Sequence, residues 1–119
     1  LYSSAASDVY KRQELEAYFK GELKKFSVRL DIKTTKFRAK IYDVLQKVPY
    51  GETTTYAALA LAAGHKNAYR AAGSANAKNP VPIIVPCHRV LSHSGLGGYS
   101  GGEGLPTKIW LLEHEAKHK

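Results

Sequence analysis

The chain contains a single cysteine, Cys87, and a histidine and an arginine follow it directly. A thiol becomes a strong nucleophile when it loses its proton, and a histidine within reach can take that proton directly or through a water molecule. His88 is the nearest histidine in sequence, but side chains of adjacent residues often point apart. A lone cysteine is also commonly an inert core residue. The residue types therefore leave two interpretations of Cys87 open, a nucleophile and a small buried side chain.

A carboxylate that orients His88 would complete a reactive group of nucleophile, base and orienting acid. Three glutamates near the end of the chain are candidates, namely Glu115, Glu113 and Glu103. Their spacing from Cys87 does not distinguish them. His88 could equally be a buried polar residue with satisfied hydrogen bonds, and Glu115 could be a solvated surface charge.

A stiff apolar segment precedes the cysteine. Residues 80–86 include three prolines and four β-branched residues, and proline fixes φ while β-branching restricts χ1. Such a segment places Cys87 at a fixed position. Asn79 stands immediately before the segment and could hold the loop through hydrogen bonds from its side chain to the backbone.

The periodicity of apolar residues predicts the elements that must position this segment. The expected helices cover about residues 14–24, 35–48, 56–63, 67–77 and 106–117, and one strand covers residues 26–32. Thr34 or Thr35 is expected to cap the second helix. A polar, glycine-rich loop at residues 92–98 is expected to form a hairpin tip or wing, and Trp110 is expected to be a core residue of the last helix.

The helices at residues 56–63 and 67–77 are separated by a short turn that contains Gly64, which is typical of a helix-turn-helix. Apart from Tyr69 and Arg70, the second helix consists mainly of small residues. A helix that reads bases in the major groove normally presents Asn, Gln, Arg or Lys side chains to them. This helix carries few side chains of these types. Its surface could instead approach a nucleic-acid backbone or a narrow groove closely, or it could pack tightly in the core.

The composition limits the classes of protein that the chain can belong to. Its 119 residues suffice for one domain with a modest core, and the formal net charge is +8. Such a charge favours a polyanionic partner or an anionic surface. One cysteine excludes an internal disulfide and a cysteine-based zinc cluster, and it fits a reducing compartment. No apolar run approaches the roughly 20 residues of a membrane span.

Several motifs together resemble one protein family. The most specific of them is Pro-Cys-His-Arg-Val at residues 86–90, and the others lie at residues 48–56, 79–82, 98–102 and 110–115. In this order they are similar to the O6-alkylguanine-DNA alkyltransferases, also called methylated-DNA–protein-cysteine methyltransferases, over residues 14–119. The resemblance implies a mostly α fold with a small β element. It also implies a helix-turn-helix, winged-helix-like architecture, as in the C-terminal domain of that family.

The resemblance further implies a division of the chain. Residues 33–119 would form the DNA-binding and active-site domain, and residues 14–32 would be a remnant of the family's N-terminal domain or a connector. Residues 1–13 are rich in serine and alanine, and the chain has no methionine. This first segment resembles a translated adapter read-through, so we expect it to be a non-native leader.

The matching positions acquire catalytic roles from the resemblance. Cys87 would accept the alkyl group, and His88 would activate the thiol through a water molecule. Glu115 would orient His88. Asn79 would lie at the hinge that joins the recognition helix to the active site.

Other matching positions would contact DNA. Arg70 would enter the base stack and fill the gap that a flipped guanine leaves, and Tyr56 would lie beside the extruded nucleotide and help to rotate its phosphate. Small residues of the second helix, among them Ala68 and Ala71, would fit the minor groove. Such a helix suits a protein that finds damage by flipping bases rather than by reading sequence.

The guanine pocket would be formed by residues near the cysteine. Tyr99 and Ser100 would line it, and Ser100 would donate a hydrogen bond to the O6 atom. The backbone carbonyls of Cys87 and Val90 would read the exocyclic amine of the base. Arg89 is also expected among the residues that contact substrate or DNA.

The implied function is DNA repair by direct reversal. An alkyl group would move irreversibly from O6 of guanine, or O4 of thymine, in double-stranded DNA to Cys87, so each chain would act once. No cofactor, metal site or membrane is implied, and the protein would act as a monomer in the cytoplasm, with the nucleoid, or in a nucleus. Two rivals stay open at this point. One is a winged-helix DNA-binding regulator with a structural cysteine, and the other is a Cys-His hydrolase that would turn over an acyl substrate.

Overall fold

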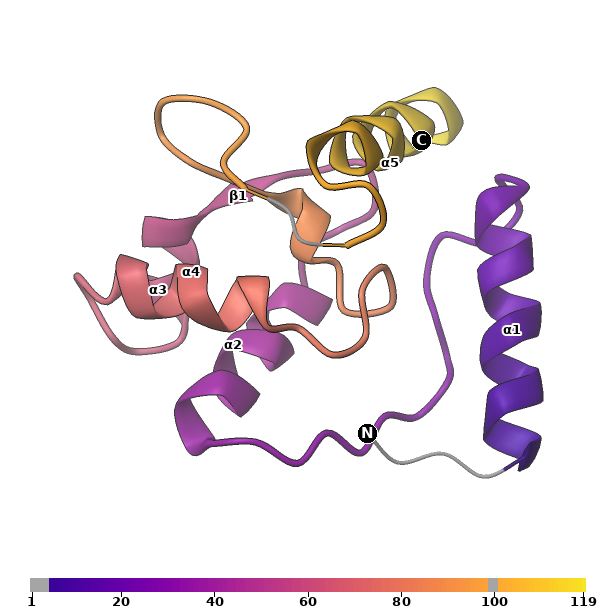
Figure 1. Ribbon diagram of the computed structural model, residues 1–119, viewed down its shortest axis with the longest axis horizontal. Coiled ribbons are helices and arrows are strands. Elements are labelled where there is room, and N and C mark those ends of the chain that lie inside the picture. The colour runs from indigo at the N-terminus through magenta and orange to yellow at the C-terminus, as the bar shows by residue number, and fades with distance from the viewer. Residues whose placement is uncertain (1–4, 99–100) are drawn as a thin grey trace.

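The computed structural model describes residues 5–98 and 101–119. In chain order these residues form α1 (Ala5–Phe19), α2 (Lys36–Gln46), β1 (Thr54–Thr55), α3 (Tyr56–Ala62), α4 (Tyr69–Ala77), the 3₁₀ helix η1 (Cys87–Arg89), β2 (Val90–Leu91) and α5 (Leu105–His118). Figure 1 shows α2, α3 and α4 grouped together, with α5 at one end of the group and α1 at the far edge of the molecule. No helix in the described ranges is long and apolar enough to cross a membrane.

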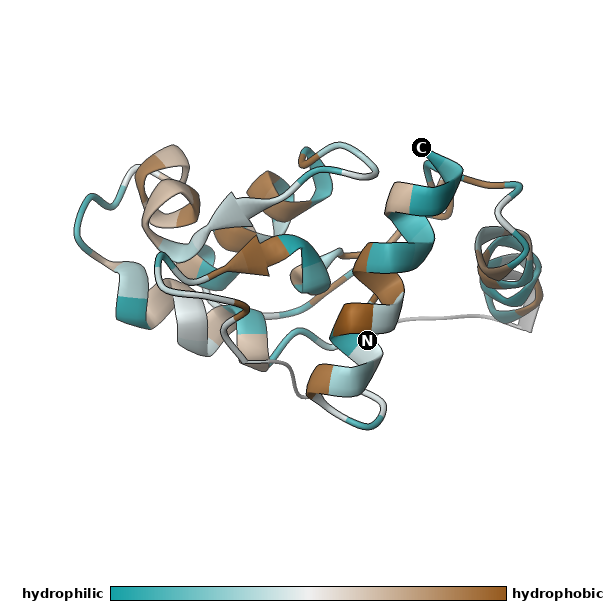
Figure 2. Cartoon of the chain, turned by 90° about the horizontal axis from the view of Figure 1, so that it is seen from above, coloured by the Kyte–Doolittle hydropathy of each residue, from teal (hydrophilic) through white to brown (hydrophobic). Residues whose placement is uncertain are grey.

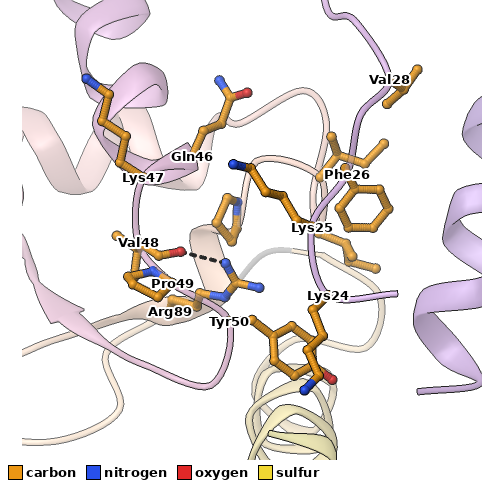
Figure 3. Close-up of a pocket in the computed structure, with 13 residues that line it drawn as sticks. Lys24, Lys25, Phe26, Val28, Gln46, Lys47, Val48, Pro49, Tyr50 and Arg89 are labelled. Atoms are coloured by element: carbon orange, nitrogen blue, oxygen red, sulfur yellow. Dashed lines mark hydrogen bonds between the residues drawn. The ribbon is translucent and has the colours of Figure 1, made fainter. Parts of the chain in front are cut away.

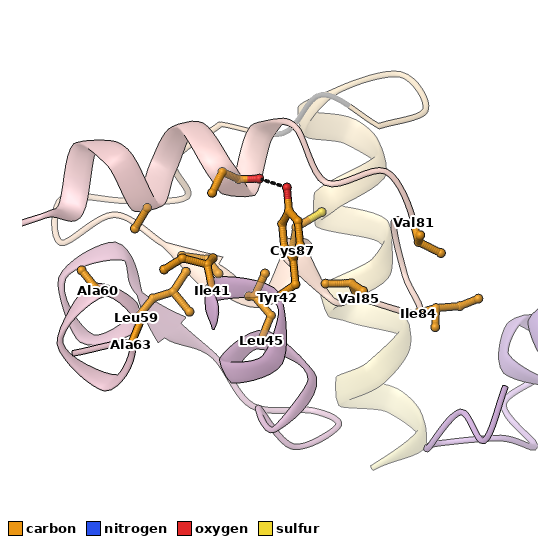
Figure 4. Packing of buried hydrophobic residues seen from close by; sticks show 13 residues of the cluster. Ile41, Tyr42, Leu45, Leu59, Ala60, Ala63, Val81, Ile84, Val85 and Cys87 are labelled. Carbon is orange, nitrogen blue, oxygen red and sulfur yellow. Dashed lines mark hydrogen bonds between the residues drawn. The ribbon is translucent and has the colours of Figure 1, made fainter. Parts of the chain in front are cut away.

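The main core lies between α2, α3, α4 and the cysteine segment (Figure 4). α2 begins after Thr35, whose side chain caps it by accepting a hydrogen bond from Arg38 N at 3.2 Å. This confirms one of the two expected caps. The inward face of α2 carries Ile41, Tyr42 and Leu45, all of them buried. Buried alanines of α3 and α4 complete the core, and their small size leaves room for the larger side chains of α2.

The expected helix-turn-helix is formed by α3 and α4. Thr55 caps α3 by accepting a hydrogen bond from Ala58 N at 3.1 Å, and the helix ends before Gly64, where φ is +85°. Glycine adopts a positive φ without strain. α4 begins at Tyr69, slightly later than the predicted start, because Asn67 also has a positive φ of 72° and cannot belong to the helix.

Two short strands connect the cysteine segment to this helical unit. β1 and β2 pair in parallel, with Thr54 opposite Val90 and Thr55 opposite Leu91. β2 is hydrophobic and lies in the middle of the molecule (Figure 2). Because β2 follows η1 directly and β1 leads directly into α3, the pair fixes the cysteine segment against the helix-turn-helix.

Two predictions near the N-terminus need correction. The first helix, expected at residues 14–24, is α1, and it ends before Gly21, where φ is +77°. Residues 26–32 are extended and alternate between partly buried and exposed side chains, but they pair with no strand in the part of the chain that the structure describes. Their apolar side chains pack on the core, so the alternation reflects one-sided burial without a sheet. α1 crosses the boundary placed after residue 13, and the division of the chain stays a prediction.

The prediction that Trp110 is a core residue is wrong, because it is 47% exposed. α5 instead turns Lys108, Leu111 and Glu115 inward. The Trp110 ring lies beside that inward face and stacks on His114, with the ring centroids 4.7 Å apart. Three of the buried side chains of α5, Lys108, His114 and Glu115, are thus ionisable, which a search for apolar periodicity does not detect.

Candidate active site

The cysteine and the two residues after it form η1, and all three are buried. The turn begins with a hydrogen bond from Cys87 N to Val85 O at 2.8 Å. Successive side chains of a 3₁₀ turn point about a third of a turn apart. Cys87 accordingly lies in the core cluster with Tyr42 (Figure 4), whereas His88 and Arg89 contact α5.

Glu115 of α5 is the residue that both of these side chains contact. Its Oε2 atom accepts hydrogen bonds from Tyr18 Oη at 2.7 Å, His88 Nε2 at 2.6 Å and Arg89 Nη2 at 2.9 Å. Its Oε1 atom accepts from Arg89 Nε at 2.8 Å and from Gly51 N at 3.1 Å. Of the glutamates considered from the sequence, Glu115 is the one that the structure places against His88.

The burial and the charges of Glu115 and His88 determine the protonation state of the histidine. Burial alone would raise the pKa of Glu115, but the hydrogen bonds from His88 and Arg89 outweigh burial and hold that pKa well below its usual range. Burial lowers the pKa of His88, and Glu115 only partly opposes this. Since an ionised carboxylate can only accept, Nε2 of His88 carries the proton. Nδ1 of His88 is buried and has no hydrogen-bond partner among the described residues, so it is the free acceptor of a neutral ring.

Two asparagines hold the loop between α4 and η1. Asn79 donates from Nδ2 to Val85 O at 2.7 Å and accepts from Val81 N at 2.9 Å, which ties the proline-rich segment together. Asn76, near the end of α4, donates from Nδ2 to Cys87 O at 3.2 Å. The helix and the cysteine are thus joined directly, a contact that the sequence did not predict.

A buried lysine of α5 also reaches the cysteine segment. Lys108 has no exposed surface, and its Nζ donates to Val90 O at 2.6 Å, to Gly98 O at 3.2 Å and to Leu96 O. Burial lowers the pKa of Lys108, and a negative charge on Cys87 would raise it. Lys108 therefore holds β2 and the glycine-rich loop that follows to α5.

Neither Tyr18 nor Lys108 was predicted to belong to the site. Lys108 shares one face of α5 with Leu111 and Glu115, at steps of three and four residues. This spacing in the sequence could have indicated that the lysine faces inward. No local pattern connects Tyr18 to Glu115, because 97 positions separate them in the chain.

The residues expected to contact DNA lie on the helix-turn-helix. Arg70 and Ala71 are exposed on α4, whereas Ala68 and Tyr56 are partly buried. Tyr56 also contacts the glycine-rich loop, since a Cβ atom added to Gly97 would lie 3.0 Å from the tyrosine hydroxyl. This close approach seats the loop against the start of α3.

The structure places Arg89 in the interior. It is 5% exposed, and its guanidinium binds both Glu115 and Val48 O, the latter from Nη1 at 2.8 Å. Its charge is therefore used within the protein rather than presented to a ligand at the surface. Tyr99 and Ser100, expected to line a guanine pocket, lie outside the described residues.

A cavity of about 600 Å³ lies beside Arg89, which is one of its lining residues (Figure 3). It is bounded by residues 24–28 and 46–50, and three lysines line it. Cys87 and His88 are not among its lining residues. No cluster of His, Cys, Asp and Glu that could hold a metal ion occurs within residues 5–98 and 101–119.

Comparison with protein families gives a match over most of the chain. Residues 36–117 match the family described as "6-O-methylguanine DNA methyltransferase, DNA binding domain". A methylated-DNA–protein-cysteine methyltransferase of Mycobacterium leprae is 49% identical over 107 residues, which cover 89% of this chain and 63% of the relative. The constitutive protein of that name from Bacillus subtilis is 47% identical over 105 residues, covering 87% and 63%. The chain thus spans a little less than two thirds of the length of these curated relatives.

Solved structures show the same similarity. A crystal structure of Mycobacterium tuberculosis O6-methylguanine methyltransferase superposes with a TM-score of 0.85 at 43% identity, covering 93% of this chain and 67% of that one. The structure of Mycobacterium tuberculosis OGT in complex with DNA gives a TM-score of 0.88 at 45% identity, covering 92% and 68%.

Proposed function

Because this chain belongs to the 6-O-methylguanine DNA methyltransferase family, we propose that it repairs alkylated DNA by direct reversal. Cys87 would accept an alkyl group, in the simplest case methyl, from O6 of guanine in double-stranded DNA. The observation that carries this proposal is the buried His88, whose Nε2 is held by Glu115 and whose Nδ1 is free. A neutral imidazole with a free nitrogen beside the only cysteine is suited to accept the thiol proton.

The proposed reaction is a single displacement. Nδ1 of His88 takes the proton of Cys87 Sγ, through a water molecule where the distance requires one. The thiolate attacks the alkyl carbon, so that a C–S bond forms while the C–O6 bond breaks and its electrons leave with guanine. A proton supplied to the departing base, ultimately the one lost by Cys87, balances the charge. The thioether that results is stable, so each chain acts once.

The surface features of the helix-turn-helix support binding to a DNA duplex. The net charge of +8 favours sequence-independent attraction to phosphates. The alkylated oxygen lies inside the duplex, so the base must leave the stack at a cost of a few kcal/mol. Arg70, exposed on α4, would fill the gap, and Tyr56 would lie beside the extruded nucleotide. The small side chains of Ala68 and Ala71 would allow α4 to approach the minor groove closely.

The remaining predicted residues take supporting roles in this proposal. Asn79 would keep the distance between α4 and the thiol constant, and Arg89 would act by holding Glu115 rather than by touching DNA. Tyr99 and Ser100 remain the predicted lining of the guanine pocket. We expect the protein to act as a monomer wherever the DNA of the cell lies, in the cytoplasm of a prokaryote or in a nucleus.

Transfer of a labelled methyl group tests the proposal. The full chain is incubated with duplex DNA that contains tritiated O6-methylguanine, and the labelled peptide is identified by mass spectrometry. We expect one methyl group per chain on Cys87, and a Cys87→Ala variant that binds the same DNA but stays unlabelled. Folded wild-type protein that binds this DNA without taking up label would contradict the proposal and favour a non-catalytic DNA-binding protein.

A further inference from the structure

The N-terminal helix α1 reaches the proposed active site through Tyr18. Tyr18 is fully buried, and its hydroxyl donates to Oε2 of Glu115 at 2.7 Å. The same oxygen accepts the hydrogen bond from His88 Nε2 at 2.6 Å. Tyr18 lies outside residues 36–117, the range that matches the family's DNA-binding domain.

We propose that Tyr18 is a positioning residue for alkyl transfer, because its hydroxyl sets the orientation and the basicity of the Glu115 carboxylate that holds His88. This inference rests on the proposed function of Cys87 and His88. Oε2 of Glu115 accepts from Tyr18, His88 and Arg89, and a carboxylate oxygen attracts each donor less strongly as the number of its donors rises. The Tyr18 hydroxyl therefore limits how far Glu115 stabilises a protonated His88, and the imidazole stays neutral and able to accept the thiol proton.

The position of the hydroxyl is fixed from several sides. His114 Nε2 donates to the backbone carbonyl of Tyr18 at 2.7 Å, which anchors the end of α1 to α5. The tyrosine ring packs against the rings of Phe26 and Tyr50, with centroids 5.7 and 6.0 Å away. Burial and the neighbouring Glu115 raise the pKa of Tyr18 far above its ordinary value, so the hydroxyl remains a donor throughout the useful pH range.

Each element packed around the carboxylate contributes a titratable or charged group. These groups are Tyr18 from α1, Tyr50 from the turn before β1, Cys87, His88 and Arg89 from η1, and Lys108 and His114 from α5. Burial lowers the pKa of His88, Glu115 raises it, and Arg89 and Lys108 lower it further. Arg89 is the charged side-chain donor to Glu115, whereas His88 donates as a neutral ring and Tyr18 donates from an uncharged hydroxyl. Removing the Tyr18 hydroxyl therefore changes the basicity of the Glu115 carboxylate without changing the net charge of the site.

The pH dependence of methyl transfer separates this role from a purely structural one. In Tyr18→Phe the ring remains, and only the hydroxyl that Glu115 accepts from is lost. We expect the acid limb of the pH–rate profile, measured in single-turnover experiments, to move to higher pH by about half a unit or more. The matched control is Tyr10→Phe on the same helix. It removes a hydroxyl that hydrogen-bonds to Ser27 Oγ at 3.0 Å. The control should leave the midpoint unchanged.

A structural role would reduce the fraction of active protein, which appears as a smaller amplitude, but it would not move the midpoint. Replacing Tyr18 by 3-fluorotyrosine provides a second variant that keeps the fold, because fluorine makes the phenol a stronger donor with little change in size. We expect its acid limb to move in the opposite direction, to lower pH. Midpoints that coincide with wild type in both variants would overturn the inference. Failure of the proposed function would be seen separately, as absence of transfer by the wild-type chain.

Discussion

The side-chain amide of Asn76 donates a hydrogen bond to the carbonyl oxygen of Cys87 at 3.2 Å, so α4 and the proposed nucleophile form one unit. Asn76 is 4% exposed, and Asn79 holds the intervening loop through two further hydrogen bonds. If DNA binds α4 as proposed, these short, buried contacts would carry a displacement of the helix to the cysteine segment.

Loss of this contact should slow alkyl transfer. Asn76→Ala leaves the buried carbonyl of Cys87 with one donor fewer, and we expect a loss of about 1–3 kcal/mol in the free energy of unfolding together with slower transfer from DNA. Urea denaturation and rapid-quench transfer measure the two effects. The matched control is Ser74→Ala, an exposed position of the same helix. A wild-type transfer rate in Asn76→Ala would show that this link is dispensable.

Neutralising Glu115 should affect both stability and reactivity. Glu115→Gln leaves the buried Arg89 guanidinium without its counter-charge, which costs about 3–5 kcal/mol. It also removes the group that fixes the tautomer of His88, and we expect transfer to slow by about 100-fold or more. Glu113→Gln, an exposed carboxylate on the same helix, is the control for both measurements. Equal effects of the two substitutions would refute the role assigned to Glu115.

The stability of the folded chain should fall as the solution is made acidic. The folded pKa of Glu115 lies below its ordinary value of 4.5, and that of His88 lies below its ordinary value of 6.5. When the pH falls below the ordinary pKa of either group, that group is protonated in the unfolded chain but still largely unprotonated in the folded chain. The free energy of unfolding therefore rises with pH through both windows. Urea unfolding at closely spaced pH values should show this slope, and Glu115→Gln should flatten the lower window.

The Lys108 ammonium should be needed to keep the glycine-rich loop in place. Lys108→Met has a similar shape but leaves the carbonyls of Val90, Leu96 and Gly98 without their common donor. We expect amide hydrogen exchange in residues 92–98 to become faster by about tenfold or more, and transfer to slow. Lys117→Met, near the exposed end of the same helix, should change neither. Unchanged exchange in that loop would contradict the bracing role of Lys108.

Arg70 should matter for damaged DNA but not for the chemistry at the thiol. Arg70→Gln should weaken binding to duplex DNA and reduce the slope of log affinity against log salt by about one. Its reaction with the free base O6-benzylguanine, which needs no base flipping, should keep the wild-type rate. Arg12→Gln, an exposed change of charge on α1, controls for net charge. Equal loss of reaction with the free base would place Arg70 in the reactive site instead.

Local sequence patterns predicted the elements that depend on neighbouring residues. α3, α4 and α5 lie close to their expected ranges, because capping residues, glycines and apolar periodicity act over a few positions. The contact between His88 and Glu115 bridges 27 positions and could not be chosen by spacing, and only the family resemblance singled out Glu115. Trp110 was wrongly predicted to be buried because the inner face of α5 is polar. Side chains on that face are buried through ionic and hydrogen-bonding contacts rather than through apolar character.

The half-exposed stack of Trp110 on His114 gives the molecule a built-in optical reporter. Trp110 is the single tryptophan of the chain, so all indole fluorescence arises at one place on α5. Its ring centroid lies 5.9 Å from that of Phe19 at the end of α1, one residue beyond the tyrosine that binds Glu115. Release of α1 from α5 would expose one face of the indole to water and shift its emission to longer wavelength. The attachment of the N-terminal helix can therefore be followed in the unlabelled protein while the cysteine reacts.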